Sequence, residues 1–168
     1  MTSEDLKPIE PKLEFVFEVR LKFYRDPWIK NLPQGGDRGY VGVLEGTFEG
    51  PNIKGKAVPH SGGDYAHVRP DGVVAFDAKY LLEEEDGTRI LLINRGYSWF
   101  RNEEARKKWE LAKEGKGTER ESPEDYYMRT FPTFEAPVGK HDWLTKNVIV
   151  GSGARGLDGN VIRYYKVL

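Results

Sequence analysis

The chain has no cysteine. This absence excludes disulfides, a thiolate nucleophile and any zinc site built on thiolates. Net charge is also small, because 26 Lys and Arg stand against 27 Asp and Glu. With no strong field of either sign, we expect neither nucleic acid nor a membrane surface as a partner. Histidine is scarce too: His60, His67 and His141 lack the helical i, i+4 spacing of metal ligands, so we predict no metal site.

Long apolar runs are missing as well. No stretch approaches the roughly 20 apolar residues of a membrane span. Residues 1–12 are polar and contain two prolines, without the basic and apolar regions of a signal peptide. We therefore expect a cytoplasmic protein. The 168 residues suit one domain, 1–168, with 1–12 as a flexible N-terminal arm.

Aromatic residues and glycine are plentiful, at 12% and 19 residues. This pairing is typical of short strands joined by tight turns. Residues 13–24 alternate most clearly, and we expect one face to carry Phe15, Phe17, Val19, Leu21 and Phe23. Further strands are predicted at 40–48, 54–59, 64–69, 73–82, 88–94, 126–135, 148–152 and 161–168.

One helix is predicted, from Asn102 as its N-cap to Gly115 just past its end. Together these elements favour an all-β fold: an antiparallel up-and-down β-barrel of about eight strands with one α-helix. A β-sandwich is the alternative. Such a barrel leaves an interior wide enough for side chains or one small ligand.

A series of motifs strengthens this reading. They include Gly46-Thr47-Phe48-Glu49-Gly50-Pro51, Arg69-Pro70-Asp71-Gly72-Val73, Asp77-Ala78-Lys79-Tyr80, Asn94-Arg95-Gly96, Tyr127-Met128-Arg129-Thr130, Phe134-Glu135 and Gly151-Ser152-Gly153-Ala154-Arg155. In this order they resemble the domain-of-unknown-function family 3237. The resemblance implies a compact calycin-like or lipocalin-like barrel that often forms oligomers, with no established activity.

Two segments depart from the family pattern. Ser61-Gly62-Gly63-Asp64-Tyr65 stands where the family usually has Gly-Gly-Ala-Asp-Trp, and His141-Asp142-Trp143-Leu144-Thr145 stands where it has Tyr-x-Trp-Leu-Asn. If these segments line a pocket, its ligand differs from that of typical members.

Carboxylates and phenols are the candidate catalytic groups. Asp64 follows two glycines, with Tyr65 and His67 close by, so a carboxylate, a phenol and an imidazole fall within four residues. The alternative is that Asp64 only caps a turn. Tyr80 should share a strand face with Phe76, whereas Asp77 faces the other way.

Glu135 is a candidate general base if it is buried, or else half of an ion pair with an arginine such as Arg129. Arginines spread over several predicted strands and loops could bind an anionic or enolate group. The predicted substrate-binding residues are Arg38, His67, Asp77, Arg95, Arg129, Trp143 and Trp28, the last in a loop expected to fold over the barrel mouth.

No nucleotide-binding or serine-hydrolase motif is present. We therefore predict no cofactor. The leading hypothesis is a barrel that binds one small organic molecule, as a cofactor-free lyase or isomerase acting on a carbonyl or phenolic compound. The alternatives are a non-catalytic carrier or sensor, or a barrel that assembles into homo-oligomers.

Overall fold

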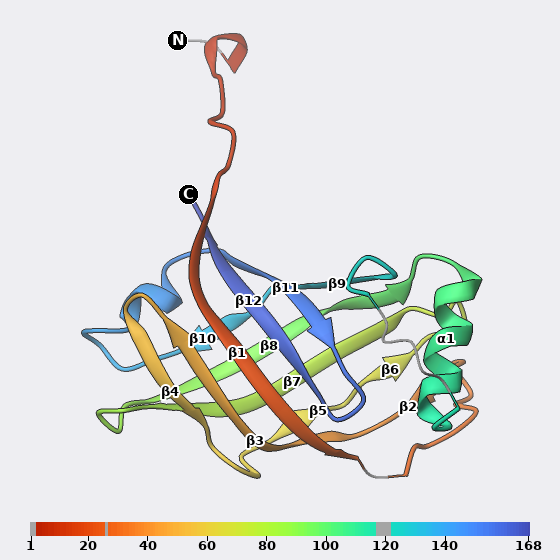
Figure 1. Cartoon of the computed structure of the whole chain (residues 1–168). Coiled ribbons are helices and arrows are strands. Elements are labelled where there is room, and N and C mark those ends of the chain that lie inside the picture. The colour runs from red at the N-terminus through yellow and green to blue at the C-terminus, as the bar shows by residue number, and fades with distance from the viewer. Residues whose placement is uncertain (1–2, 26, 117–121) are drawn as a thin grey trace.

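The structure is a computed structural model that describes residues 3–25, 27–116 and 122–168. Twelve strands and three helical segments follow one another in the described chain (Figure 1). They are η1 (Ser3–Asp5), β1 (Leu13–Arg25), β2 (Asp37–Arg38), β3 (Val41–Gly50), β4 (Ile53–Ala57), β5 (Gly63–Asp64), β6 (His67–Val68), β7 (Val74–Glu84), β8 (Arg89–Phe100), α1 (Glu103–Lys113), β9 (Tyr126–Thr130), β10 (Thr133–Glu135), η2 (Asp142–Thr145), β11 (Ile149–Arg155) and β12 (Gly159–Val167).

The sheet closes into a barrel. Its order runs β8-β9-β11-β12-β1-β3-β4-β7, and β7 pairs again with β8. Each of these long strands neighbours the next one along the chain, and every pairing is antiparallel. The predicted up-and-down barrel is therefore confirmed, and a sandwich is excluded because the sheet has no second layer.

Closure leaves one face of every strand inside. On β7 the even-numbered residues are the more buried set, and on β8 the even-numbered residues from Ile90 to Ser98 are all buried. The core contains Phe17, Val19, Leu21, Val43, Phe48, Ile53, Phe76, Tyr80, Leu82, Ile90, Leu92, Tyr126, Met128, Phe134, Ile149, Ile162 and Tyr164. Burial of these side chains is the main driving force for the fold.

The first strand departs from its predicted alternation at one point. Its pairing with β12 shifts between Phe15 and Phe17, so a bulge lies at Val16. Phe15 therefore moves to the outer face, where its ring contacts Tyr165 at 5.9 Å and the Arg163 guanidinium at 4.7 Å. The prediction that Phe15 shares a face with Phe17 is wrong, because a simple alternation takes no account of a bulge.

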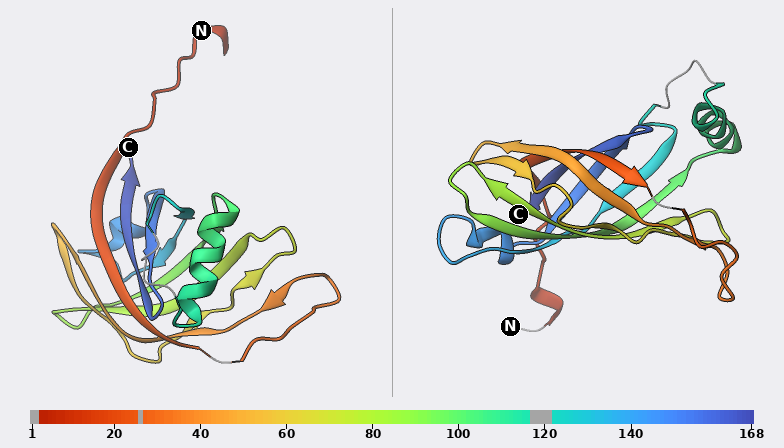
Figure 2. Two further views of the ribbon diagram at one scale, coloured as in Figure 1. Left: turned by 45° about the vertical axis from the view of Figure 1, so that its right-hand side comes forward. Right: turned by 90° about the horizontal axis from the view of Figure 1, so that it is seen from below.

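Two predicted strands are each divided in the structure. The strand expected at 64–69 is divided into β5 and β6, and the strand expected at 126–135 into β9 and β10. By contrast, the strand expected at 88–94 continues to Phe100. The paired β2 and β6 extend the barrel wall outward and carry the loop of residues 27–36 with them (Figure 2).

The helix agrees with its predicted limits. Oδ1 of Asn102 accepts a hydrogen bond from the Ala105 amide at 2.8 Å, and Gly115 adopts φ = 70° just past the end. The α1 helix stands beside the end of the barrel opposite η2 (Figure 2). None of the helices in the described residues has the length and apolar character needed to cross a membrane.

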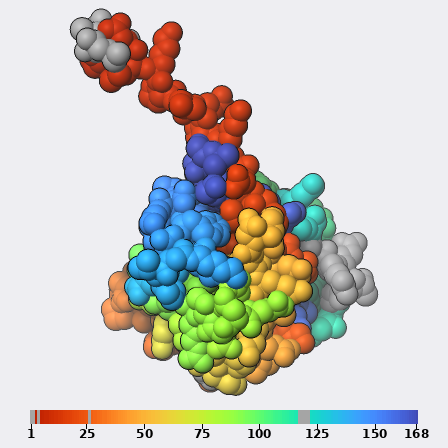
Figure 3. All heavy atoms as spheres, turned by 90° about the vertical axis from the view of Figure 1, so that its left-hand side faces the viewer, coloured from red at the N-terminus to blue at the C-terminus, as the bar shows by residue number. Residues whose placement is uncertain are grey.

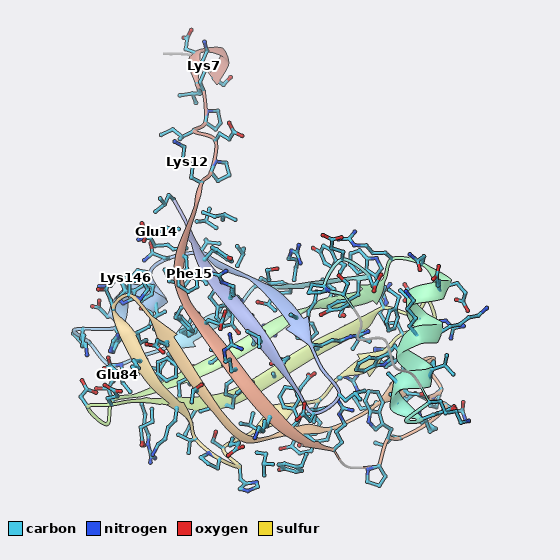
Figure 4. The ribbon with its side chains drawn as sticks, in the orientation of Figure 1. Lys7, Lys12, Glu14, Phe15, Glu84 and Lys146 are labelled. Carbon is cyan, nitrogen blue, oxygen red and sulfur yellow. The ribbon has the colours of Figure 1, made fainter. Side chains whose placement is uncertain are left out.

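At the η2 end, an ion-pair cluster fastens the segment that covers the barrel. Glu84, at the end of β7, is 7% exposed and His141 is 1% exposed. The Glu84 carboxylate lies 2.6 Å from Nε2 of His141 and 2.6 Å from Nζ of Lys140. Figure 3 shows this end filled by side chains, and Figure 4 marks Glu84 there.

Residues 3–12 project away from the barrel (Figure 1). Leu6 and Ile9 in this arm are exposed. The arm joins the barrel at Lys12, whose carbonyl accepts a hydrogen bond from the Leu168 amide at 2.8 Å. The start of β1 and the end of β12 therefore lie side by side.

The Glu84 cluster generates a stability prediction. Glu84→Ala leaves His141 and Lys140 without their shared buried carboxylate, so we expect the free energy of unfolding to fall by about 3 kcal/mol. Urea unfolding measures it. The control is Glu85→Ala, which removes the neighbouring exposed carboxylate and should change stability by less than about 0.5 kcal/mol. Equal effects of the two substitutions would contradict the assigned role of Glu84.

Candidate functional site

The ladder between β5, β6 and β7 is interrupted at one position. Gly63 pairs with Lys79 and His67 with Ala75, so this register sets Tyr65 opposite Asp77. Side chains bind the backbone groups of these two residues. Oδ1 of Asp64 accepts a hydrogen bond from the Asp77 amide at 2.8 Å, and the Tyr65 carbonyl accepts one from Nη1 of Arg38 at 2.8 Å. The interruption thus holds a carboxylate and a guanidinium in fixed positions.

Asp64 is a half-buried carboxylic acid with a shifted pKa. Burial raises the pKa of Asp64 to about 7, and the negative charge of Asp77 adds to this effect. The Asp77 amide and the Arg38 charge act in the opposite direction without cancelling it. Both protonation states of Asp64 are therefore populated near neutral pH, as a general acid or base requires.

Asp64 belongs to the inner face of the barrel. It pairs with Ala78 on β7, and Ala78 pairs in turn with Asn94 on β8. Side chains directly across an antiparallel pair share a face, with Cβ atoms about 5 Å apart. Tyr80 lies two residues further along that face of β7. A carboxylate, an amide and a phenol thus surround the small Ala78 side chain.

Several inward polar atoms have no hydrogen-bond partner within the described part of the chain. Those of the barrel wall are Asn94 Oδ1, Ser98 Oγ, Thr130 Oγ1 and Asn160 Oδ1. The phenols of Tyr80 and Tyr164 hydrogen-bond only to each other. Buried polar groups normally have partners, so such a concentration needs an explanation. We call Tyr80, Asn94, Thr130 and Tyr164 the inner polar cluster; each is at most 3% exposed.

Register links the members of the inner polar cluster. Gly96, two residues beyond Asn94, pairs with Thr130, and Thr130 pairs with Gly151. Gly151 also pairs with Tyr164. A Cβ on Gly151 would meet both the Thr130 hydroxyl and the Tyr164 ring, so glycine allows these two side chains to lie close together. Burial raises the pKa of Tyr80 and of Tyr164, and the two phenols form a hydrogen bond with each other.

Other predicted site residues lie on the outer surface. Nε of Arg95 is 3.2 Å from Oδ1 of Asp77, in a cross-strand pair on the outer face of β7 and β8. Arg129 is exposed and donates to the Met128 carbonyl at 2.9 Å. Tyr65 is 62% exposed, with its ring 4.9 Å from that of Tyr40. Of the predicted catalytic residues, the structure places Asp64 and Tyr80 on the same inner face of the barrel.

His67 and Trp28 lie in the extension of the wall. Nε2 of His67 is 3.0 Å from the Gly35 carbonyl, and the Trp28 ring occupies the space beside Gly39 that a Cβ would need. The expected position of the Trp28 loop over the barrel mouth is not what the structure shows, because β2 pairs with β6 and carries the loop outward.

Glu135 and Trp143 lie away from Asp64. Glu135 is exposed and pairs with Leu91, so the buried general base predicted there is absent from the structure. Its position on the outer face follows from the alternation with buried Phe134. Trp143 lines a hollow of about 210 Å³ with Phe15 and Pro51. Figure 4 labels Phe15 near the start of β1.

A larger hollow of about 590 Å³ lies between β1, β3 and the β11–β12 turn. It opens to solvent and carries charges of both signs, including Lys22 and Glu45, which form an ion pair at 2.8 Å. Arg155, on its rim, lies over the rings of Phe100 and Trp109, each at 4.4 Å. These groups already have partners, so the hollow is a weaker candidate than the inner face.

Sequence reasoning missed Asn94, Thr130 and Tyr164. A signal was available, because each interrupts an apolar alternation at an inward position, as Asn94 does after Ile90 and Leu92. It also missed the pairing of Glu84 with His141, which are far apart in sequence. In the described part of the chain no group of three or more His, Asp or Glu side chains is arranged to hold a metal ion.

Fold and site together define a class: closed up-and-down barrels with polar groups on the inner face. The chain belongs to the family described as "Protein of unknown function (DUF3237)", which it matches over residues 11–167. It is 31% identical over 158 residues to a UPF0311 protein of Clostridium acetobutylicum, an alignment covering 94% of this chain and 95% of that protein.

Solved structures agree with this assignment. A Rhodopseudomonas palustris protein of unknown function superposes with a TM-score of 0.84 at 27% identity, over 96% of this chain and 100% of that one. A "beta-barrel like protein" of Acinetobacter baumannii gives 0.79 at 27% identity, over 96% and 99%. A protein described as an enzyme from Penicillium herquei gives 0.64 at 20% identity, over 97% and 98%, and shares the fold.

The raised pKa of Asp64 predicts how stability depends on pH. Because the folded state holds this proton more tightly than the unfolded chain, stability is greatest below about pH 4 for this group and falls as pH rises towards 7. The loss is at most about 4 kcal/mol. Asp64→Asn should remove this contribution and be more stable than wild type at pH 8.

Urea unfolding of wild type and Asp64→Asn between pH 4.5 and 8 measures the difference. Glu85→Gln, which removes one exposed charge, is the matched control. An Asp64→Asn difference that does not change with pH would contradict the shifted pKa.

Proposed function

We propose that the inner face around Ala78 binds one small organic molecule and that Asp64 transfers a proton to or from it. The observation that carries this proposal is a half-buried carboxylic acid with a pKa of about 7, on the same inner face as an unpartnered amide oxygen two strands away. Structural carboxylates are usually paired and have lowered pKa values, as Asp86 does here through the Thr88 amide. The pKa of Asp64 is instead raised, as is common for carboxylic acids at functional sites.

In this reaction Asp64 acts as the base when ionised. The Asp77 amide fixes the carboxylate through Oδ1, so Oδ2 is the oxygen that accepts the proton. The same carboxyl group returns the proton at another atom of the ligand, which makes the overall change an isomerisation or an elimination and needs no cofactor. Arg38 limits the rise of the Asp64 pKa and so keeps the ionised form accessible.

A catalytic role has support from a distant likeness. The Penicillium herquei protein that shares the fold is described as an enzyme, so a barrel of this type can accommodate catalysis. Shared fold alone does not carry an activity from one protein to another. Support for a catalytic role of this chain therefore comes from Asp64.

The alternative is a carrier or sensor that binds the same ligand without converting it. The unpartnered hydroxyls and amide favour binding whether or not chemistry follows. The two functions differ in one result. An enzyme converts the ligand only when Asp64 is present, whereas a carrier releases it unchanged.

The test is a thermal-shift screen of wild type against small ketones, enones, lactones and phenols, with product analysis of every hit. For a converted hit we expect Asp64→Asn to lower kcat at least about 100-fold while the protein stays folded. With Asp64 as base, kcat/KM should rise with pH through a midpoint near 7.

Asp77→Asn provides a sharper control. Because the Asp77 charge helps to raise the pKa of Asp64, its removal should move the midpoint to lower pH and leave the reaction intact. Release of every bound compound unchanged would favour the carrier. Full conversion by Asp64→Asn would exclude Asp64 as the proton-transfer group.

A further inference from the structure

The inner polar cluster is uncharged. Its four side chains offer hydroxyl donors from Tyr80, Thr130 and Tyr164 and an acceptor oxygen from Asn94. Burial keeps both phenols protonated, because it raises their pKa values. The cluster is therefore suited to a neutral group that accepts hydrogen bonds. A carboxylate or phosphate there would be an unpaired buried charge, which is strongly unfavourable.

The hydroxyls converge rather than scatter. Tyr80 and Tyr164 come from strands on different sides of the barrel, β7 and β12, yet their hydroxyls share a hydrogen bond. Thr130 adjoins Tyr164 across Gly151, where no side chain intervenes. All three residues are at most 3% exposed. The hydrogen bond between the phenols uses one of their two O–H groups, so the other phenol O–H and the Thr130 hydroxyl remain as donors without a described acceptor. Convergent, unpartnered donors are the arrangement that binds an oxygen atom on which negative charge develops.

Asp64 lies on the same face, one cross-strand step from Ala78, while Tyr80 lies two residues along β7. By strand geometry these steps are about 5 Å and about 7 Å. A carbonyl oxygen held by the cluster would thus leave a carbon one or two bonds away within reach of the carboxylate. The two features have complementary roles: one removes a proton and the other receives the charge.

We propose that the inner polar cluster binds the carbonyl oxygen of a neutral, enolisable ketone or enone, with the α-carbon next to Asp64. This inference depends on the proposed function and names its substrate class. The Asp64 carboxylate breaks the α C–H bond and takes the proton, and the electron pair moves to the oxygen to form an enolate. The phenol hydroxyls stabilise the enolate, and Asp64 returns the proton to the α- or γ-carbon.

Two readouts separate binding from proton transfer. The probes are 2-tetralone, an enolisable ketone, and tetralin, which has the same ring skeleton without the oxygen. Affinities are measured by ligand-observed NMR, and exchange of the 2-tetralone α-protons in D₂O is followed in the same samples. We expect wild type to bind the ketone at least tenfold more tightly than tetralin and to accelerate exchange.

Conservative variants assign the preference to the cluster. Tyr80→Phe, Tyr164→Phe and Thr130→Val each remove one hydroxyl and nearly preserve shape, so each should lower the ketone preference three- to tenfold. Tetralin affinity should stay within twofold. Tyr126→Phe is the matched control, because this buried phenol already accepts a hydrogen bond from the Arg155 amide at 2.7 Å. It should leave the preference unchanged.

The outcomes are distinct. The proposed subsite is wrong if wild type does not bind 2-tetralone more tightly than tetralin. It is also wrong if all three cluster variants retain that preference. If Asp64→Asn keeps the preference and loses exchange, both proposals stand. If the cluster variants lose the preference while wild type shows no exchange above solvent, the subsite stands and proton transfer by Asp64 fails. Melting temperatures well above the assay temperature confirm that the variants fold. Thr130→Val removes a hydroxyl with no described partner, whereas either Phe substitution also removes the hydrogen bond between the two phenols.

Discussion

Closure of the sheet between β1 and β12 is the constraint on which the rest of the structure depends. These strands are the first and last of the barrel, and their pairing from Leu13 to Lys22 completes the ring. Once the ring is complete, one face of every strand loses contact with water. Apolar side chains on that face then drive folding, while any polar side chain there must find a partner or remain unsatisfied.

Buried polar groups in two parts of the barrel differ in whether they have partners. At the η2 end, the buried Glu84 carboxylate has two basic partners, which fits a structural fastening. Further along the inner face, Asn94 and Thr130 have no described partner, Tyr80 and Tyr164 have only each other, and Asp64 is partly protonated near neutral pH. Unsatisfied polar groups lower stability. Their concentration around Ala78 is consistent with a site arranged for a ligand rather than for the fold.

Much of the fold was predictable from local patterns. The alternation of residues 13–24 and the Asn102 cap each depend on nearby residues, and each led to the right element. The bulge at Val16 and the interruption at Tyr65 were not predictable in this way. The bulge depends on pairing with β12, which is far away in sequence, and the interruption depends on the register with the following long strand, β7.

The site was predictable only in part, for the same reason. Asp64 and Tyr80 were identified from their chemistry and spacing, whereas Glu135 lies outside because an alternation does not reveal which face is inner. The unpartnered state of Asn94 or Thr130 is a property of the assembled interior. Conversely, the resemblance to the DUF3237 family predicted a barrel, and the structure has one.

The central claim is that Asp64 gains and loses its proton near neutral pH. The direct test is a titration of the side-chain carboxyl ¹³C signals by NMR between pH 3 and 9, with the Asp64 signal assigned by its loss in Asp64→Asn. The account predicts a midpoint near 7 for this signal. A midpoint near 4, the ordinary range for aspartic acid, would contradict it.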